Sequence, residues 1–355
     1  MKIKETAYKA LFDGLSKYDT QNVFTPPRLI RRILSKVDFT SNYKVLVWYN
    51  VEFLIYLVKE VGLNPKNIYI YTNTKDKLIL EKQGYNVVYQ ENIDFDKIIN
   101  ELIILKFDVV LGNPPFSKNK KEPNKLWARF VIISFSLCNK NGVVALITPS
   151  SWISSTNSAH KHVKDKLLYV SLSNTTSEFF GGTGGTQKFI YFIAQNNISE
   201  NCMTEFDNDI TLLLNPCQTP YPPVKSTSHL AYSIVKKLSE SDFDVHNWQR
   251  FDVSDNRAGI VVSMSKGNSY DITYDHTDEY LVSRYKLLCD ENFGQNIANN
   301  LNLKLYRLLR WVIRSGPALA GNFKQLPIPT DVLSDNELYE RLNLTQEEIE
   351  YVENY

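Results

Sequence analysis

The segment that decides the fold is Asp108–Phe116, with the sequence DVVLGNPPF. Its apolar, β-branched beginning predicts a buried strand of the kind found at the centre of a parallel sheet. Gly112 and the two prolines end that strand, because proline has no N–H donor and disfavours helical backbone in the residue before it. The sequence therefore predicts a rigid turn at the carboxyl end of a strand, where open α/β sheets bind their ligands.

This turn also carries a specific chemical pattern. The side-chain carbonyl of Asn113 and a neighbouring backbone carbonyl, held by the prolines, offer two hydrogen-bond acceptors at a fixed separation. Two converging acceptors fit one exocyclic amino group, and Phe116 adds a flat face for an aromatic ring. The pattern predicts a site that orients a base amine and leaves its nitrogen lone pair free to attack. The alternative is an ordinary strand-end turn, because Asn-Pro and Pro-Pro are common in loops.

The four residues of the turn resemble the Asn-Pro-Pro-Phe/Tyr motif of amino methyltransferases that act on DNA. In that family the motif holds a flipped-out target adenine, and S-adenosylmethionine donates the methyl group. The resemblance implies that the catalytic residues of this chain are Asn113, Pro114, Pro115 and Phe116. Three lysines follow at once and are either an ordinary surface loop or contacts to DNA phosphates: Lys118, Lys120 and Lys121.

Bulk properties limit the other classes. The 355 residues leave room for two domains, and a net charge of +1 argues against a histone-like binder without excluding a local basic face. No apolar run is long enough to span a membrane, and the first residues, MKIKE, lack an apolar signal core. We therefore expect a cytoplasmic protein. The four cysteines form no C-x-x-C pair, so we expect no metal site.

A proline-rich element precedes the first predicted strand. Thr25 is predicted to cap a helix that begins at Pro26, the usual place for a helix-starting proline. Phe24, Thr25 and Pro26 also resemble the Phe-Thr-Pro element of adenine methyltransferases. The resemblance implies that these three residues line the S-adenosylmethionine pocket.

The chain departs from the family pattern after the strand at residues 43–48. A loop of the form Asp-Pro-x-x-Gly-x-Gly is expected there, whereas residues 49–52 read YNVE, without glycine and in a shorter loop. Three interpretations stay open. A changed loop binds the donor, with Asn50 and Glu52 as polar contacts; the donor binds weakly; or the chain is a catalytically silent relative that still binds DNA.

Two later positions are further candidates for the cofactor site. Asn73 follows the strand at residues 68–72 and is a substitute for the acidic residue that accepts from the ribose hydroxyls of the donor. Asp94 resembles the acidic residue that contacts the donor's adenine, and it is equally an N-cap for the next helix, which is the interpretation we prefer. The alternation of strands and helices up to Asn113 predicts a doubly wound, mostly parallel sheet, the Rossmann-like fold of class I methyltransferases.

The βα rhythm stops near residue 196. We therefore expect a catalytic domain at 1–196, an α+β target-recognition region at 197–330 and a helical tail at 331–355. A helix predicted at 301–313 carries Lys304, Arg307 and Arg310 on one face. A solvated helix face is the default explanation for these cations, and contact with DNA phosphates is the one that the resemblance implies.

The order of these pieces resembles the gamma-type N6-adenine DNA methyltransferases of restriction-modification systems and phages. The resemblance implies site-specific methylation of flipped-out adenine in double-stranded DNA, in a bacterial or phage-infected cell, with a companion restriction nuclease as a further partner. A catalytically silent DNA-binding relative is the main alternative, and methylation of a glutamine amide in protein is a weaker one. The oligomeric state does not follow from the sequence.

Overall fold

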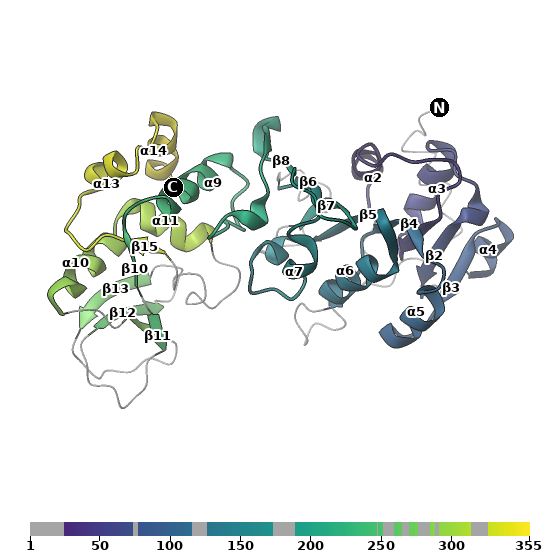
Figure 1. Cartoon of the computed structure of the whole chain (residues 1–355), viewed down its shortest axis with the longest axis horizontal. Helices are drawn as coiled ribbons and strands as arrows, with labels where there is room; N and C mark the ends of the chain where they lie inside the picture. The colour runs from purple at the N-terminus through teal and green to yellow at the C-terminus, as the bar shows by residue number, and fades with distance from the viewer. Residues whose placement is uncertain are drawn as a thin grey trace. The chain divides into compact units, whose positions relative to one another are not determined.

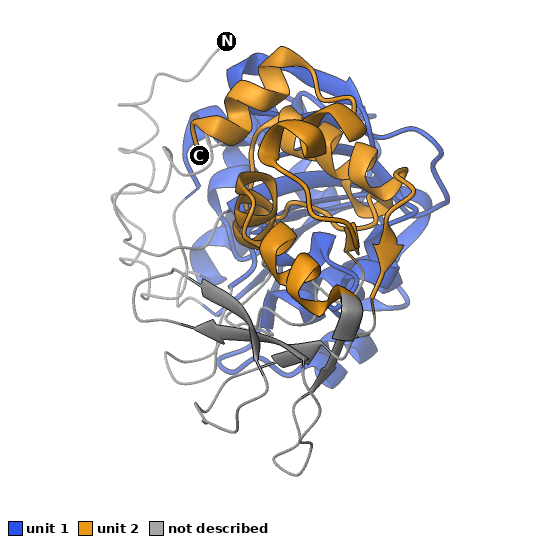
Figure 2. Ribbon diagram, turned by 90° about the vertical axis from the view of Figure 1, so that its left-hand side faces the viewer, with its two compact units in different colours: residues 1–215 blue, residues 216–355 orange. Residues whose placement is uncertain are grey.

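The computed structural model divides into two compact units, residues 1–215 and 216–355 (Figure 2). The residues that it describes are 25–73, 77–115, 126–172, 189–246, 248–250, 259–264, 270–275, 285–287, 291–313 and 326–355. Several residues singled out above lie outside these ranges: Phe24, Phe116, Lys118, Lys120 and Lys121.

A nine-stranded sheet forms the centre of the first unit, in the order β3-β2-β1-β4-β5-β7-β6-β8-β9 (Figure 1). Its strands are β1 (Val45–Trp48), β2 (Ile68–Thr72), β3 (Asn86–Tyr89), β4 (Phe107–Gly112), β5 (Cys138–Pro149), β6 (Leu167–Ser171), β7 (Phe189–Gln195), β8 (Met203–Glu205) and β9 (Thr211–Leu213). The first five strands pair in parallel, and β7 runs antiparallel to both of its neighbours. The predicted mostly parallel, doubly wound sheet is confirmed.

The strand order reverses between β1 and β4. The chain builds β1, β2 and β3 towards one edge and then returns to place β4 on the other side of β1. Ligands of open α/β sheets bind at such a switch point, outside the carboxyl ends of the strands. Asn113, directly after β4, therefore lies at the position in the sheet best suited to a ligand.

Helices cover both faces of this sheet (Figure 1). On one face, α2 (Pro27–Leu34), α3 (Glu52–Lys59) and α4 (Lys77–Lys82) share a buried apolar cluster with alternate residues of the strands. On the other face, α5 (Phe95–Leu102) and α6 (Leu126–Leu137) pack through aromatic contacts around Phe130. The shorter helices of this unit are α7 (His160–Val163) and three single turns at Pro65–Asn67, Ser150–Ile153 and Asp207–Asp209.

The sheet continues beyond the expected domain boundary at residue 196. Strand β8 pairs in parallel with β6, and β9 pairs with β8. The buried carboxylate of Glu205, on β8, forms an ion pair with Arg32 of α2 and accepts a hydrogen bond from Tyr169 of β6. These contacts tie residues 203–213 to the first unit, so its boundary lies at residue 215.

Helices dominate the core of the second unit. They are α9 (His229–Ser239), α10 (Glu291–Leu301), α11 (Lys304–Val312), α13 (Asp335–Arg341) and α14 (Gln346–Glu353), preceded by a single turn at Pro216–Gln218. The helix predicted at 301–313 is in fact α11 and the end of α10, separated by Leu303, whose extended backbone begins α11. The short strands are β10 (Asp244–Val245), β11 (Trp248–Arg250), β12 (Gly259–Met264), β13 (Tyr270–Asp275), β14 (Tyr285–Leu287) and β15 (Pro327–Ile328).

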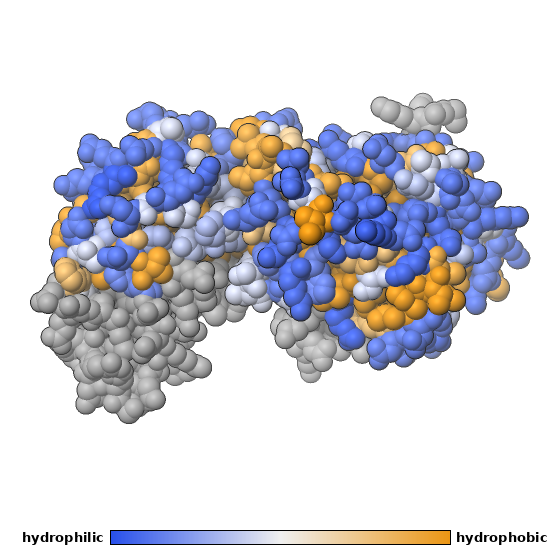
Figure 3. All heavy atoms as spheres, in the orientation of Figure 1, coloured by the Kyte–Doolittle hydropathy of each residue, from blue (hydrophilic) through white to orange (hydrophobic). Residues whose placement is uncertain are grey.

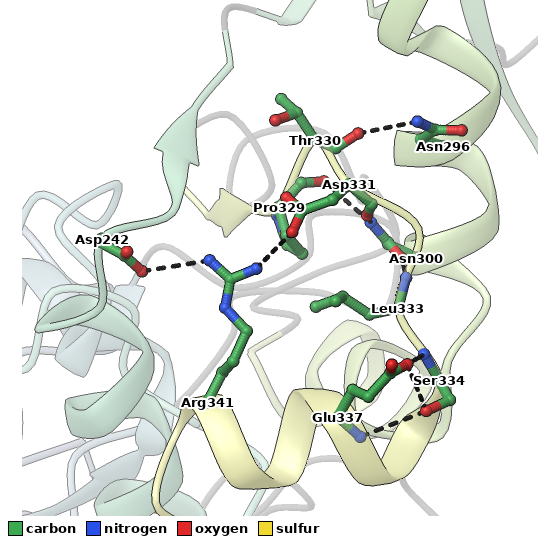
Figure 4. Close-up of polar contacts among 10 residues, drawn as sticks. All are labelled: Asp242, Asn296, Asn300, Pro329, Thr330, Asp331, Leu333, Ser334, Glu337 and Arg341. Atoms are coloured by element: carbon green, nitrogen blue, oxygen red, sulfur yellow. Dashed lines mark hydrogen bonds and ion pairs between the residues drawn. The ribbon is translucent and has the colours of Figure 1, made fainter.

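A polar network fixes the segment that follows β15 (Figure 4). The buried amide of Asn300 donates to the carbonyls of Pro329 and Asp331, at 2.9 and 2.6 Å, and accepts from the N–H of Leu333. Arg341 pairs with Asp331 and with Asp242. Asn300 thus supplies the hydrogen bonds that this irregular backbone lacks, as buried polar groups require.

Hydrophilic side chains occupy much of the visible surface in Figure 3, with smaller hydrophobic areas between them. None of the helices among the described residues combines the length and the apolar character that crossing a membrane requires.

Candidate active site

The turn after β4 begins at a position that only glycine can occupy. Gly112 has a φ of +143°, and a Cβ atom built on it would lie 2.6 Å from the carbonyl oxygen of Trp48. Trp48 is the register partner of Gly112 across the switch point. The absence of a side chain therefore lets the ends of β1 and β4 approach each other closely.

Asn113 follows at once and is only 4% exposed. Its backbone N–H donates to Oδ1 of Asn50 at 2.8 Å, and its Nδ2 lies 3.4 Å from Oγ1 of Thr25. Its own Oδ1 is buried and has no hydrogen-bond partner among the described residues. A buried acceptor without a donor is costly, so this oxygen needs a donor that is not among the described residues.

Thr25 does not cap α2, contrary to the expectation from the sequence. The N-cap position is Pro26, Pro27 is the first helical residue, and no side chain caps this end. The Thr25 hydroxyl instead faces Asn113. The backbone N–H of Thr25 donates to Oε1 of Glu52 at 3.3 Å. Tertiary contacts with Asn113 and with Glu52 of α3 therefore use the hydroxyl and the N–H of Thr25.

The glycine-free loop is a tight turn that leads directly into α3. Tyr49 has a left-handed φ of +61°, its N–H donates to the carbonyl of Tyr71, and the N–H of Asn50 donates to the carbonyl of Trp48 at 2.7 Å. Asn50 and Glu52 are 1% and 0% exposed. Oδ1 of Asn50 holds the Asn113 backbone and Oε1 of Glu52 holds the Thr25 backbone, so these two oxygens serve the protein rather than a donor molecule.

The structure thus brings four of the predicted residues together: Thr25, Asn50, Glu52 and Asn113. Two further candidates for the cofactor site, Asn73 and Asp94, lie farther along the carboxyl edge of the sheet. Asn73 follows β2 and is half-buried. Asp94 is the N-cap of α5, and its carboxylate accepts from the N–H groups of Asp96 and Lys97 at 3.1 Å each. The preferred capping role of Asp94 is confirmed.

Gln90, which directly follows β3, was missed by the sequence argument. It is 5% exposed, and its Oε1 accepts from the Tyr71 hydroxyl at 2.9 Å and from the Asp94 N–H at 3.3 Å. Burial raises the pKa of Tyr71 to about 12, so that hydroxyl keeps its proton and donates. Nε2 of Gln90 is buried without a partner among the described residues. Its place at a strand end was the available signal.

The three cations expected on one face of α11 separate in the structure. Lys304 and Arg307 are exposed, and Lys304 forms an ion pair with Glu353. Arg310 is 5% exposed and lies against the core, so the expectation of phosphate contact fails for it. Positions six residues apart on a helix differ by about 120° in direction, which turns Arg310 away from the face of Lys304.

Part of the chain matches the model of a known protein family. Residues 62–180 match the model of the family described as Eco57I restriction-modification methylase. No protein of curated function matches the chain in sequence.

Among solved structures, the chain is similar to the M protein of the type I restriction enzyme EcoKI, with 13% sequence identity and a TM-score of 0.38. The matched region covers 85% of this chain and 73% of the M protein. It is similar to the type IIG restriction endonuclease BpuSI at 9% identity, covering 70% of this chain but only 38% of BpuSI, with a TM-score of 0.38. A Listeria monocytogenes protein described as a class I S-adenosylmethionine-dependent methyltransferase matches at 10% identity, 56% and 70% coverage and a TM-score of 0.38.

The family match covers β2 to β6 and includes the Asn113 turn. The segment that carries this turn thus matches the model of the Eco57I restriction-modification methylase family, which agrees with the resemblance seen in the sequence.

Proposed function

We propose that this chain is a site-specific DNA methyltransferase that transfers a methyl group from S-adenosylmethionine to the N6 amine of an adenine flipped out of duplex DNA. One observation carries the proposal. Oδ1 of Asn113 is a buried acceptor without a partner among the described residues, at the switch point of the sheet. The family match over the same turn supports methyl transfer to DNA.

The chemistry asked of the turn is orientation of an amine. Oδ1 of Asn113 and the carbonyl of Pro114 accept the two amine hydrogens, and Phe116 stacks on the base. The nitrogen lone pair then points away from the turn and is free to attack. Two acceptors also raise the electron density on this nitrogen as it forms the new bond. Positioning of the amine and electrostatic stabilisation in a buried site account for the rate acceleration.

The residues at the carboxyl edge also fit a methyl donor with a nucleoside part. Nε2 of Gln90 is a buried hydrogen-bond donor without a partner among the described residues. Oε1 of the same side chain accepts from the N–H of Asp94. Gln90 and Asn73 would hold the nucleoside, and the resemblance to the Phe-Thr-Pro element makes Phe24, Thr25 and Pro26 further candidates for contacts with the donor. When bound, S-adenosylmethionine supplies the electrophilic methyl group. In the glycine-free loop, the side-chain oxygens of Asn50 and Glu52 accept from the protein's own backbone.

Duplex DNA is the substrate, and the reaction takes place in the cytoplasm of a bacterium or a phage-infected cell. Flipping a base costs a few kcal/mol, which stacking on Phe116 and the hydrogen bonds to Asn113 offset. Lys118, Lys120 and Lys121 follow the turn, and Lys304 and Arg307 are exposed on α11 of the second unit. These cations are candidates for contacts to DNA phosphates, and a companion restriction nuclease is the further partner proposed.

The test is a methyl-transfer assay with labelled S-adenosylmethionine on DNA of varied sequence, followed by mass spectrometry of the nucleosides. We expect N6-methyladenine. Asn113→Ala should lower the turnover number by a factor of about 100 or more and leave DNA binding intact. Asn64→Ala, which alters an exposed asparagine at the turn Pro65–Asn67, is the control and should retain full activity. N4-methylcytosine as the product, or an active Asn113→Ala variant, would overturn the proposal.

A catalytically silent DNA-binding relative is the second candidate. It is favoured by the engagement of Asn50 and Glu52 with the protein's own backbone. Calorimetry with S-adenosylmethionine, with and without duplex DNA, separates the two functions. Binding of the donor supports the methyltransferase. Binding of DNA without any binding of the donor would make the silent relative the better description.

A further inference from the structure

We infer that Asn50 is a positioning residue for the amine-binding turn: its side-chain oxygen holds the backbone of Asn113 in place instead of contacting the methyl donor. The inference rests on the proposed function, because it assigns a role within that active site. It also replaces the role that the sequence pattern suggested for Asn50.

The contact joins the two strands at the switch point. The N–H of Asn113 and Oδ1 of Asn50 are 2.8 Å apart, and the two residues are 63 positions apart in the sequence. Both side chains are almost completely buried, so water does not compete for this hydrogen bond. It therefore connects the end of β1 to the end of β4 in a place of low dielectric constant, where hydrogen bonds are strong.

The Asn-Pro-Pro segment has few backbone groups that can donate a hydrogen bond. Pro114 and Pro115 have no N–H, so the Asn113 N–H is the only backbone donor in the Asn-Pro-Pro segment. The partner of this one donor decides how the segment is held at its beginning. Gly112, directly before it, has no side chain that could pack against a neighbour.

Asn50 is itself held rigidly, as a positioning residue must be. Its N–H donates to the carbonyl of Trp48, and its carbonyl accepts from the N–H of Phe53 in the first turn of α3. The backbone of Asn50 is thus fixed by β1 on one side and by α3 on the other. A glycine-rich loop has no side chain to offer in this way, so the shortened loop gains a contact that a longer glycine loop lacks.

Loss of the side-chain oxygen would leave the Asn113 N–H buried and unpaired. The turn would then move to find a new partner, and Oδ1 of Asn113 would move with it. A displacement of about 1 Å at a reacting centre costs on the order of 100-fold in rate. Because Asn50 does not touch the donor in this assignment, the affinity for S-adenosylmethionine should stay unchanged.

The experiment compares Asn50→Ala and Asn50→Asp with a matched control, Asn196→Ala. The aspartate keeps an acceptor oxygen at the same position. Asn196 lies after β7, at the opposite edge of the sheet from the turn, and donates to the carbonyls of Phe135, Cys138 and Asn139. Its removal lowers the melting temperature without touching the turn. Turnover number, KM for DNA, the calorimetric Kd for S-adenosylmethionine and amide hydrogen exchange of the peptide containing Asn113 are measured for each variant.

We expect Asn50→Ala to lower the turnover number by about 10- to 100-fold, with the Kd for S-adenosylmethionine unchanged and faster exchange of the Asn113 amide. Asn50→Asp should recover most of the activity, and Asn196→Ala should turn over at the wild-type rate. Unchanged turnover in Asn50→Ala would overturn the inference, and so would a loss confined to donor affinity. If Asn50→Ala does not fold, Asn50→Asp decides: wild-type turnover supports the inference, and a large loss overturns it. An inactive wild-type protein would instead refute the proposed function.

Discussion

Gly112 lies directly against Trp48: a Cβ atom on the glycine would be 2.6 Å from the Trp48 carbonyl oxygen and 3.0 Å from its nitrogen. The obstacle is backbone on a central strand, which cannot move aside as the end of a flexible side chain can. The close approach of these two residues brings the ends of β1 and β4 together, and with them Asn50 and Asn113.

The first prediction concerns this approach. Gly112→Ala should destabilise the first unit by about 2–4 kcal/mol, because the new methyl group forces the strand ends apart and the backbone φ of +143° is strained for any residue with a side chain. Methyl transfer should fall with it. Thermal denaturation and the methyl-transfer assay measure the two effects. Gly84→Ala is the control: its φ is also positive, but its nearest neighbour is a side-chain atom at 3.7 Å. Equal stability losses in both variants would show that the close approach to Trp48 is unimportant.

The second prediction concerns Thr25 and the amide of Asn113. Thr25→Val keeps the shape of the side chain but removes the oxygen that faces Nδ2 of Asn113 at 3.4 Å. The amide should then rotate more freely, and the turnover number should fall by about 10-fold, which corresponds to about 1.4 kcal/mol. Thr25→Ser keeps the oxygen and should stay close to the wild type. A serine variant as slow as the valine variant would indicate that packing, and not the hydrogen bond, is what matters at this position.

The third prediction concerns Gln90. Gln90→Glu keeps an oxygen for the Tyr71 hydroxyl and the Asp94 N–H, but it replaces the buried donor Nε2 with a second acceptor. If Nε2 of Gln90 donates to the nucleoside of S-adenosylmethionine, the calorimetric Kd for S-adenosylmethionine should rise by about 10-fold or more. The reason is that an unsatisfied buried polar group costs about 1–3 kcal/mol. Asn86→Ala, on the exposed edge strand β3, provides the comparison. An unchanged Kd in Gln90→Glu would remove Gln90 from the donor site.

The fourth prediction concerns the acid stability of the second unit. Burial alone would raise the pKa of Glu348, but hydrogen bonds from Lys237, Ser233 and the Thr345 N–H outweigh it and hold this pKa below its usual value. A carboxylate whose pKa is lowered in the folded state contributes its full stabilisation of the fold at a pH above its pKa in the unfolded chain, about 4.3. This stabilisation is lost as the pH falls through the folded pKa.

Glu348→Gln should therefore lower the stability of this unit by about 1–3 kcal/mol at neutral pH and by much less in acid. Thermal denaturation of the wild type and the variant over a range of pH measures the difference. The two melting curves should begin to approach each other as the pH falls below the unfolded pKa of about 4.3, and they should meet below the folded pKa. A constant difference at every pH would mean that the charge of Glu348 contributes nothing to the fold.

Local sequence predicted the elements whose pattern is complete in itself. Strand β2 has the predicted bounds, because a continuous apolar run defines it. The turn at Asn113 was found in the same way, since proline and glycine act on the backbone of their immediate neighbours. Asp94 caps α5 through contacts only two and three residues away.

The remaining features depend on contacts between distant residues. Thr25 has the local sequence of a helix cap, but Glu52 and Asn113 take its polar groups. Asn50 had the sequence position of a cofactor ligand, and only the close approach of β1 and β4 shows what its side chain holds. For Gln90 the sequence offered only its place at the end of a strand. Its unpartnered nitrogen becomes evident only when its oxygen is seen to accept from Tyr71 and Asp94.

The pairing of β6 with β8 sets the shortest piece of this chain that is worth producing alone. A fragment ending at residue 196 would include every residue of the described turn, but it would expose the backbone edge of β6 that β8 covers. Unpaired strand edges promote aggregation. The same cut would remove the Glu205 carboxylate with which Arg32 and Tyr169 interact. Expression of the first unit alone for crystallisation or screening should therefore extend to residue 215.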